Sequence, residues 1–225
     1  MVDYNQRVKW VKGDYVESIR FEVRIVAAGT GSSVWDHPNA GSVVQRFMPP
    51  ERHHGPMVGI VHLSNVRPTP NVLRDVVVTI GEEVKAGRYG DFSLIVSSED
   101  EATRSVISDI AKSHDVAMFV STSTVDLAVA EPVGSLTIKD RETLDYVLRI
   151  GGTVTATELA RQLGVEQTTA GNRLVALHKK GYLQRVNRSH PVGDLFIDPR
   201  SVRLTEPERV DVSVASHAPT HQLGS

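Results

Sequence analysis

The sequence predicts an α/β domain with a mixed sheet, followed by a smaller domain of three helices and a β-hairpin. Over residues 18–121, strand-like apolar segments alternate with segments of helical spacing, which is typical of strands joined by crossover helices. Beyond residue 140, three helical segments precede two short strand-like segments. We therefore expect an α/β sensing or dimerisation domain over 1–131, a linker over 132–139, the smaller domain over 140–204 and a disordered tail over 205–225.

The composition is that of an ordinary globular protein. The chain has 225 residues, of which 23% are charged, and a net charge of −2. It contains no cysteine, which excludes disulfides, thiolate metal sites and cysteine nucleophiles and agrees with a reducing compartment. No apolar run reaches the roughly 20 residues that cross a bilayer, and the N-terminus lacks a secretory signal pattern. We expect a cytoplasmic protein with no membrane partner.

Five segments of the first domain are predicted to be strands. Residues 18–28 alternate apolar and polar side chains, which indicates a half-buried strand. Residues 57–63 are apolar nearly throughout, as in a central strand. Residues 92–96 and 116–121 are also expected to be strands, and residues 42–47 a short one.

Two helices are expected between these strands. Thr69 is suited to cap a helix over 71–86, with Pro70 in its first turn. Ser97 or Ser98 is expected to cap a second helix, whose first turn is acidic. Residues 125–134 are expected to form a short helix or an irregular segment. The alternation of strands and helices predicts a parallel or mixed sheet.

The smaller domain is predicted to be a winged helix-turn-helix. A first helix over 140–150 ends at two glycines, and Thr155 and Glu158 have capping-box spacing at the start of a second helix. Gly164 permits a tight turn before a third helix over 167–180. Strands over 183–187 and 195–198 then flank a Pro- and Gly-containing loop, as in a wing.

The third helix provides the expected DNA-reading residues. Burial of Ala170, Leu174 and Leu177 leaves an outer face near its N-terminus, where a recognition helix meets base edges. On this face Gln and Asn amides suit adenine, a Thr can offer its hydroxyl or methyl group, and an Arg can reach guanine or a phosphate. Basic side chains further along the helix and in the wing are suited to bind phosphates. The expected DNA-binding residues are Gln167, Thr168, Asn172, Arg173, Lys179, Lys180, Arg185, Arg188 and His190.

The local charge supports a nucleic-acid partner although the net charge does not. Residues 167–190 contain five Lys or Arg side chains and no Asp or Glu. An ordinary solvated face usually mixes both signs. Glu166 departs from the Ser or Thr usual at a helix N-cap, and its charge would face DNA phosphates.

Three motifs resemble those of winged-helix bacterial regulators of the broad MarR, ArsR and Lrp-like group. They are Leu-Ala-Arg-Gln-Leu-Gly-Val at 159–165, Thr-Thr-Ala-Gly-Asn-Arg-Leu at 168–174 and Leu-His-Lys-Lys-Gly-Tyr-Leu at 177–183. The resemblance covers roughly a quarter to a third of the chain. It implies a transcriptional regulator that binds double-stranded DNA. A homodimer is expected because one recognition helix makes few base contacts.

The first domain is weakly similar in element order to STAS-type domains, which are small α/β interaction modules. This resemblance implies binding of a small-molecule or protein effector without catalysis. The alternative for the whole chain is a non-catalytic adaptor that uses the winged helix to dock a protein partner.

No enzyme, metal site or cofactor is expected. The residues that suggest catalysis or metal binding lack the supporting motifs: no acid–His spacing accompanies the histidines, and no nucleophile elbow surrounds the serine. These residues are His37, His53, His54 and His62 as metal ligands, and Ser98, His114 and Asp115 as a catalytic set.

Overall fold

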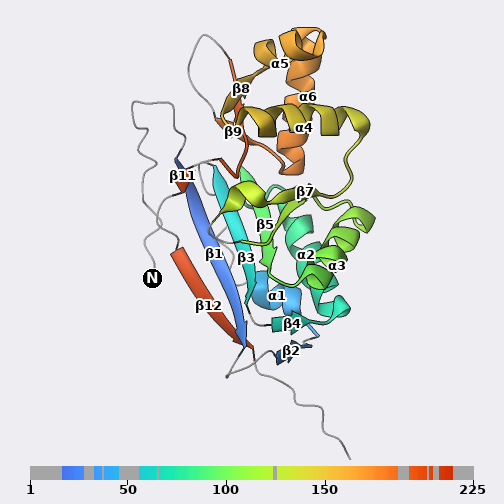
Figure 1. Cartoon of the computed structure of the whole chain (residues 1–225). Helices are drawn as coiled ribbons and strands as arrows, with labels where there is room; N and C mark the ends of the chain where they lie inside the picture. Colours follow the sequence, from blue (N-terminus) through green and yellow to red (C-terminus); the bar gives the residue numbers. More distant parts are fainter. Residues whose placement is uncertain are drawn as a thin grey trace, which may run out of the picture.

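The fold is mixed α/β, with a central sheet and helices, and a C-terminal region of helices with a small antiparallel sheet (Figure 1). This confirms the predicted class at that level. The computed structural model describes residues 17–27, 33–36, 38–45, 56–64, 66–123, 126–186, 193–201, 203–204 and 208–214.

The centre of the large sheet is parallel. Its strand order is β11–β1–β3–β5–β6–β7, and β12 also pairs with β1; β11 is Arg203–Leu204 and β12 is Glu208–Val214. Among the strands that the structure describes in this sheet, only the short β7 runs antiparallel, against β6. The parallel alignment brings the carboxyl ends of the central strands to one edge of the sheet. The strands of this centre are β1 (Glu17–Ala27), β3 (Met57–Ser64), β5 (Phe92–Ser98), β6 (Met118–Ser121) and β7 (Glu131–Val133).

Three helices of the described part of the chain cover one face of this sheet. They are α1 (Ala40–Gln45), α2 (Pro70–Lys85) and α3 (Glu101–Ser113). Alternate residues of each strand join their core, as Val61 of β3 and Leu94 of β5 do. The intervening residues face away from these helices, because successive side chains of a strand point to opposite sides.

The starts of α2 and α3 follow from capping side chains. Thr69 accepts a hydrogen bond from the backbone N–H of Val72 at 3.4 Å, and Pro70 opens α2, as expected. The expected Ser caps of α3 are wrong. Asp100 is the N-cap and accepts from the N–H of Thr103 at 2.9 Å. Ser98 instead accepts from the N–H of Asp100 at 3.3 Å, within the turn before the helix.

The expected short strand over 42–47 is also wrong, because α1 occupies residues 40–45. The helix packs so closely on α2 that a Cβ at Gly41 would collide with the Asp75 carbonyl oxygen. The Gly41 N–H donates to Oδ2 of Asp75 at 2.7 Å. Gly41 and Asp75 are 34 residues apart in the sequence, so local propensity could not reveal their contact.

Two short elements lie at the carboxyl ends of the strands, far from the C-terminal region (Figure 1). Strands β2 (Ser33–Trp35) and β4 (Val66–Pro68) form a separate parallel pair.

The segment expected to be a short helix or irregular contains the 3-10 helix η1 (Leu127–Val129), followed by β7.

The C-terminal region contains three helices and a three-stranded antiparallel sheet of order β8–β10–β9. Thr137 caps its first helix in a capping box with Asp140. The strand β8 was not anticipated from the sequence. The elements are α4 (Ile138–Ile150), β8 (Thr153–Thr155), α5 (Ala156–Leu163), α6 (Gln167–Lys180), β9 (Gln184–Val186) and β10 (Leu195–Ile197).

One hydrophobic core joins this region to the large sheet. Val58, Ile60, Ile95 and Phe119, on the sheet face opposite α1–α3, pack in the same cluster as the inner side chains of α4–α6. Of the residues expected to form a linker, 132–133 belong to β7. The two parts therefore share buried surface rather than only a covalent connection.

Within the tail expected to be disordered over 205–225, residues 208–214 form a strand and the others lie outside the described residues; another strand lies just before the tail. β11 (Arg203–Leu204) and β12 (Glu208–Val214) both pair in parallel with β1. The register aligns Glu22 with Arg209 and Arg24 with Asp211. Valine occupies alternate positions 210, 212 and 214, a strand pattern within a polar segment.

Among the residues that the structure describes, no helix is long and apolar enough to cross a membrane.

Candidate nucleic-acid interface

Helices α5 and α6 are joined by a tight turn. Thr155 accepts from the N–H of Glu158 at 3.2 Å, and Glu158 accepts from the N–H of Thr155 at 2.8 Å. This confirms the expected capping box. Gly164 ends α5 with φ of 64°, the left-handed conformation that favours glycine. The chain can then reverse within two residues and begin α6 at Gln167.

One face of α6 is buried against the rest of the C-terminal region. Ala170, Leu174 and Leu177 are fully buried, and their spacing of four and three residues defines one side of a helix. Gly171 faces α5, where an added Cβ would lie 3.6 Å from the Cβ of Ala156. The burial expected from the sequence is thus confirmed, and the opposite side of α6 is left to solvent.

Four of the expected DNA-binding residues are exposed on α6: Gln167, Thr168, Asn172 and Lys179. Thr168, Asn172 and Lys179 are spaced by four and seven residues, so they lie on one outer face. Gln167 stands beside them at the first turn. This face offers two amides, a hydroxyl and an ammonium group to a partner.

Two other expected DNA-binding residues turn toward α4. Arg173 donates to Oε2 of Glu142 at 3.1 Å, and Lys180 donates to Oδ2 of Asp140 at 2.8 Å. Burial alone would raise the pKa of Asp140, but hydrogen bonds from Lys180 and Thr137 outweigh it and hold that pKa below its usual value. The Arg173 and Lys180 side chains therefore link α6 to α4.

The hairpin that follows α6 contains the remaining expected residues. The guanidinium group of Arg185 pairs with the carboxylate of Asp194, so its positive charge is also paired within the chain. Arg188 and His190 lie outside the described residues.

Glu166 occupies the N-cap of α6, as expected, but its side chain makes no capping hydrogen bond. Its side chain is exposed next to Gln167. The first-turn N–H groups of α6 therefore lack the side-chain acceptor that Ser, Thr, Asp or Asn would supply. A carboxylate at this position would also face the phosphates of any nucleic acid bound along α6.

The far end of α6 is anchored to the large sheet. Nδ1 of His178 lies 3.1 Å from the Leu183 carbonyl oxygen and 3.4 Å from Oδ1 of Asp91, just before β5. Oδ2 of Asp91 accepts from the N–H of Arg185 at 2.9 Å. Burial alone would lower the pKa of His178, but the hydrogen bond and charge of Asp91 outweigh it and raise the pKa above its usual value.

A second anchor involves Tyr182. Its buried hydroxyl donates to the Val133 carbonyl oxygen at 2.8 Å, and its ring meets that of Phe119 edge-on at 6.1 Å. Burial raises the pKa of this hydroxyl. Gln184 adds a third tie by donating to the Met57 carbonyl oxygen at 2.8 Å. These anchors were not predicted from the sequence, although a Tyr buried in a core usually requires a hydrogen-bond partner.

Arg200 provides a fourth contact at this junction. It donates to the Ala130 carbonyl oxygen at 2.6 Å, and its guanidinium carbon lies 5.7 Å from the centre of the Phe119 ring. Asp198 binds the same guanidinium group and keeps it in place. The orientation of α6 relative to the sheet is therefore fixed by several polar and apolar contacts.

No protein-family model matches this chain, and no curated protein matches it. Within the described residues, no three His, Asp or Glu side chains gather into a group that could hold a metal ion.

Proposed function

We propose that the C-terminal region is a winged helix-turn-helix that binds double-stranded DNA sequence-specifically, and that the protein is a transcriptional regulator. The observation that carries this proposal is the exposed outer face of α6, with Thr168, Asn172 and Lys179 in line and Gln167 beside them. The element order of α4–β8–α5–α6–β9–β10 fits the proposal. In such modules the second helix of the pair enters the major groove.

The side chains of this face divide into base readers and a phosphate ligand. The amides of Gln167 and Asn172 can each donate and accept, as adenine requires in the major groove, and Thr168 can meet a base edge or a thymine methyl group. Lys179, eleven residues beyond Thr168 on the same face, suits a phosphate. Arg173, Lys180 and Arg185 are held by Glu142, Asp140 and Asp194, so they contribute less to phosphate binding than their sequence positions suggest.

A homodimer is part of the proposal, because two recognition helices would double a small set of base contacts. The α/β region would then serve dimerisation or the sensing of an effector. The anchors at His178 and Tyr182 favour this division of roles, since they hold α6 in a fixed orientation on the sheet. The proposed site of action is the cytoplasm.

Selection of bound sequences from a random DNA library, followed by anisotropy titration of the enriched duplex, tests the proposal. We expect one enriched motif and an affinity that falls as salt rises. The Asn172→Ala variant should lose preference at one base, whereas Lys112→Ala, an exposed control on α3, should bind like the wild type. No enrichment, or binding without salt dependence, would contradict the proposal and favour the adaptor alternative.

A further inference from the structure

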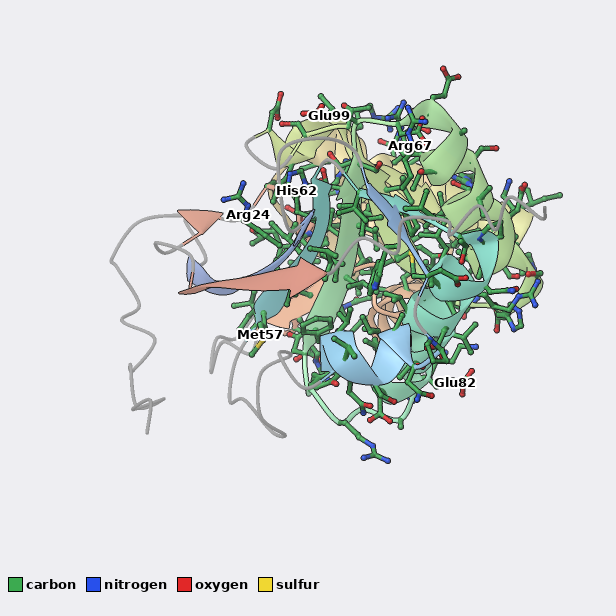
Figure 2. All side chains as sticks on the ribbon, turned by 90° about the horizontal axis from the view of Figure 1, so that it is seen from below. Arg24, Met57, His62, Arg67, Glu82 and Glu99 are labelled. Carbon is green, nitrogen blue, oxygen red and sulfur yellow. The ribbon has the colours of Figure 1, made fainter. Side chains whose placement is uncertain are left out.

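A row of polar side chains crosses four adjacent strands near their carboxyl ends. The register aligns Arg24 of β1 with His62 of β3, His62 with Ser97 of β5, and Ser97 with Ser121 of β6. Figure 2 shows Arg24 and His62 next to each other, on the side of the sheet away from α1. Aligned residues of neighbouring parallel strands share a face, so all four positions lie on one surface.

The residues that flank this row identify the surface. The apolar residues that flank the row belong to the core beneath α1–α3, so the row itself faces the other way. These flanking residues are Val23, Ile25, Val61, Leu63, Val96 and Val120. One row nearer the amino ends, the same surface carries Ile60, Ile95 and Phe119, which belong to the core shared with the C-terminal region.

Solvent exposure falls along the row, from an open end at β1 and β3 to a closed end at β5 and β6. Arg24 and His62 are half-buried, whereas Ser97 is 0% exposed and Ser121 is 1% exposed. The side chains that can bear positive charge therefore stand at the solvent end. The hydroxyls stand at the closed end.

Ser97 is the member of the row whose hydroxyl group is unsatisfied. Its Oγ is buried and has no hydrogen-bond partner among the described residues. The hydroxyl of Ser121, by contrast, donates to the Ser123 carbonyl oxygen at 2.7 Å and accepts from the Ser123 N–H at 3.0 Å. A buried hydroxyl without a hydrogen-bond partner carries an uncompensated desolvation cost, which a bound hydrogen-bond acceptor would remove.

We propose that this row binds the oxyanion group, a phosphate or a carboxylate, of a small molecule. The Ser97 hydroxyl donates to the oxyanion at the closed end, and His62 and Arg24 donate at the open end. Guanidinium, imidazole and hydroxyl groups all offer N–H or O–H donors, and hydrogen bonds to an oxyanion are among the strong ones. The oxyanion is expected between His62 and Ser97, which the register aligns on neighbouring strands. This proposal does not depend on DNA binding.

Ser93 provides a matched control for Ser97. It lies four residues earlier on β5 and therefore on the same face. It is likewise 0% exposed, and its Oγ has no hydrogen-bond partner in the described part of the chain. It differs in its neighbour on β3, which is the apolar Val58 rather than His62.

The test is calorimetric titration of the full-length chain at constant ionic strength, with inorganic phosphate and, separately, succinate as probes. Thermal unfolding without probe is measured on the same samples. We expect the wild type and Ser93→Ala to bind at least one probe with equal affinity, and Ser97→Ala to bind it about tenfold more weakly. Without probe, both variants should melt at or above the wild-type temperature, because each removes an unpartnered hydroxyl.

The choice between the probes identifies the oxyanion, since preference for phosphate or for succinate supports the proposal in either case. Two results would overturn it. One is no binding of either probe by the wild-type protein. The other is a Ser97→Ala variant that melts normally and binds the probe as tightly as Ser93→Ala does.

Discussion

Nδ1 of His178, near the end of α6, lies 3.4 Å from Oδ1 of Asp91, the residue that precedes β5. The same carboxylate accepts the backbone N–H of Arg185 at the start of the hairpin. Asp91 thus holds both the end of α6 and β9 against the sheet. Asp91 therefore connects the surface proposed to read DNA with the α/β region. A single substitution at Asp91 can remove the charge of this connection.

Stability should depend on pH through His178. Its folded-state pKa is raised above the usual 6.5, so the contact stabilises the chain fully below that usual value. This stabilisation is lost as the pH rises through the raised folded-state pKa. Denaturant unfolding of the wild type and Asp91→Asn between pH 5 and pH 9 should therefore show the larger difference at acid pH.

The groups that face His178 define the controls for this measurement. Arg185 opposes protonation, the Leu183 carbonyl favours it, and the Phe196 ring lies edge-on at 6.3 Å. His178→Gln should lose the pH dependence, and His114→Gln, at an exposed histidine after α3, should keep it. An unchanged pH profile in His178→Gln would show that another group titrates.

Tyr182→Phe should destabilise the junction between the two regions. Removal of the hydroxyl leaves the Val133 carbonyl oxygen buried without its 2.8 Å donor, at a cost of about 1–2 kcal/mol. The ring and its edge-on contact with Phe119 remain, so the loss measures the hydrogen bond rather than the packing. Chemical denaturation gives the free energy of unfolding, and Tyr146→Phe, at a half-buried tyrosine on α4, is the control. Equal stability of the two variants would contradict the assigned role.

The sequence predicted best where a few neighbouring residues decide the structure. The capping box of Thr155 and Glu158 and the left-handed Gly164 follow from local hydrogen bonding and backbone sterics. The same holds for Thr69 and Pro70 at the start of α2.

Prediction failed where distant residues decide. Residues 40–45 are helical because they pack on α2, and β12 forms because β1 offers it an edge. In the candidate interface, Arg173 and Lys180 are seven residues apart, which already places them on one flank of α6. What the sequence did not reveal is that Glu142 and Asp140 of α4 face that flank.

Glu166 is expected to limit both the stability of α6 and its affinity for DNA. Its side chain makes no capping bond, so Glu166→Ser should raise the free energy of unfolding by about 0.5–1 kcal/mol. Glu166→Gln removes the charge without supplying a good cap. Both variants should bind the selected duplex more tightly, but only Ser should stabilise the chain. Thermal unfolding and anisotropy separate the two effects, and a Gln variant that binds like the wild type would refute the electrostatic one.

The salt dependence of DNA binding should distinguish Lys179, which is exposed on α6, from Lys180, which is paired with α4. Lys179 is exposed, so Lys179→Ala should reduce the slope of log affinity against log salt by about 1 for every sequence tested. Lys180 donates to Asp140 at 2.8 Å, so Lys180→Ala should mainly lower stability and leave the slope nearly unchanged. Anisotropy titrations at four salt concentrations, with unfolding measured in parallel, give both quantities. If the two variants lose the same slope, the contact of Lys180 with α4 does not persist in the complex, and α6 must adjust relative to α4 when DNA binds.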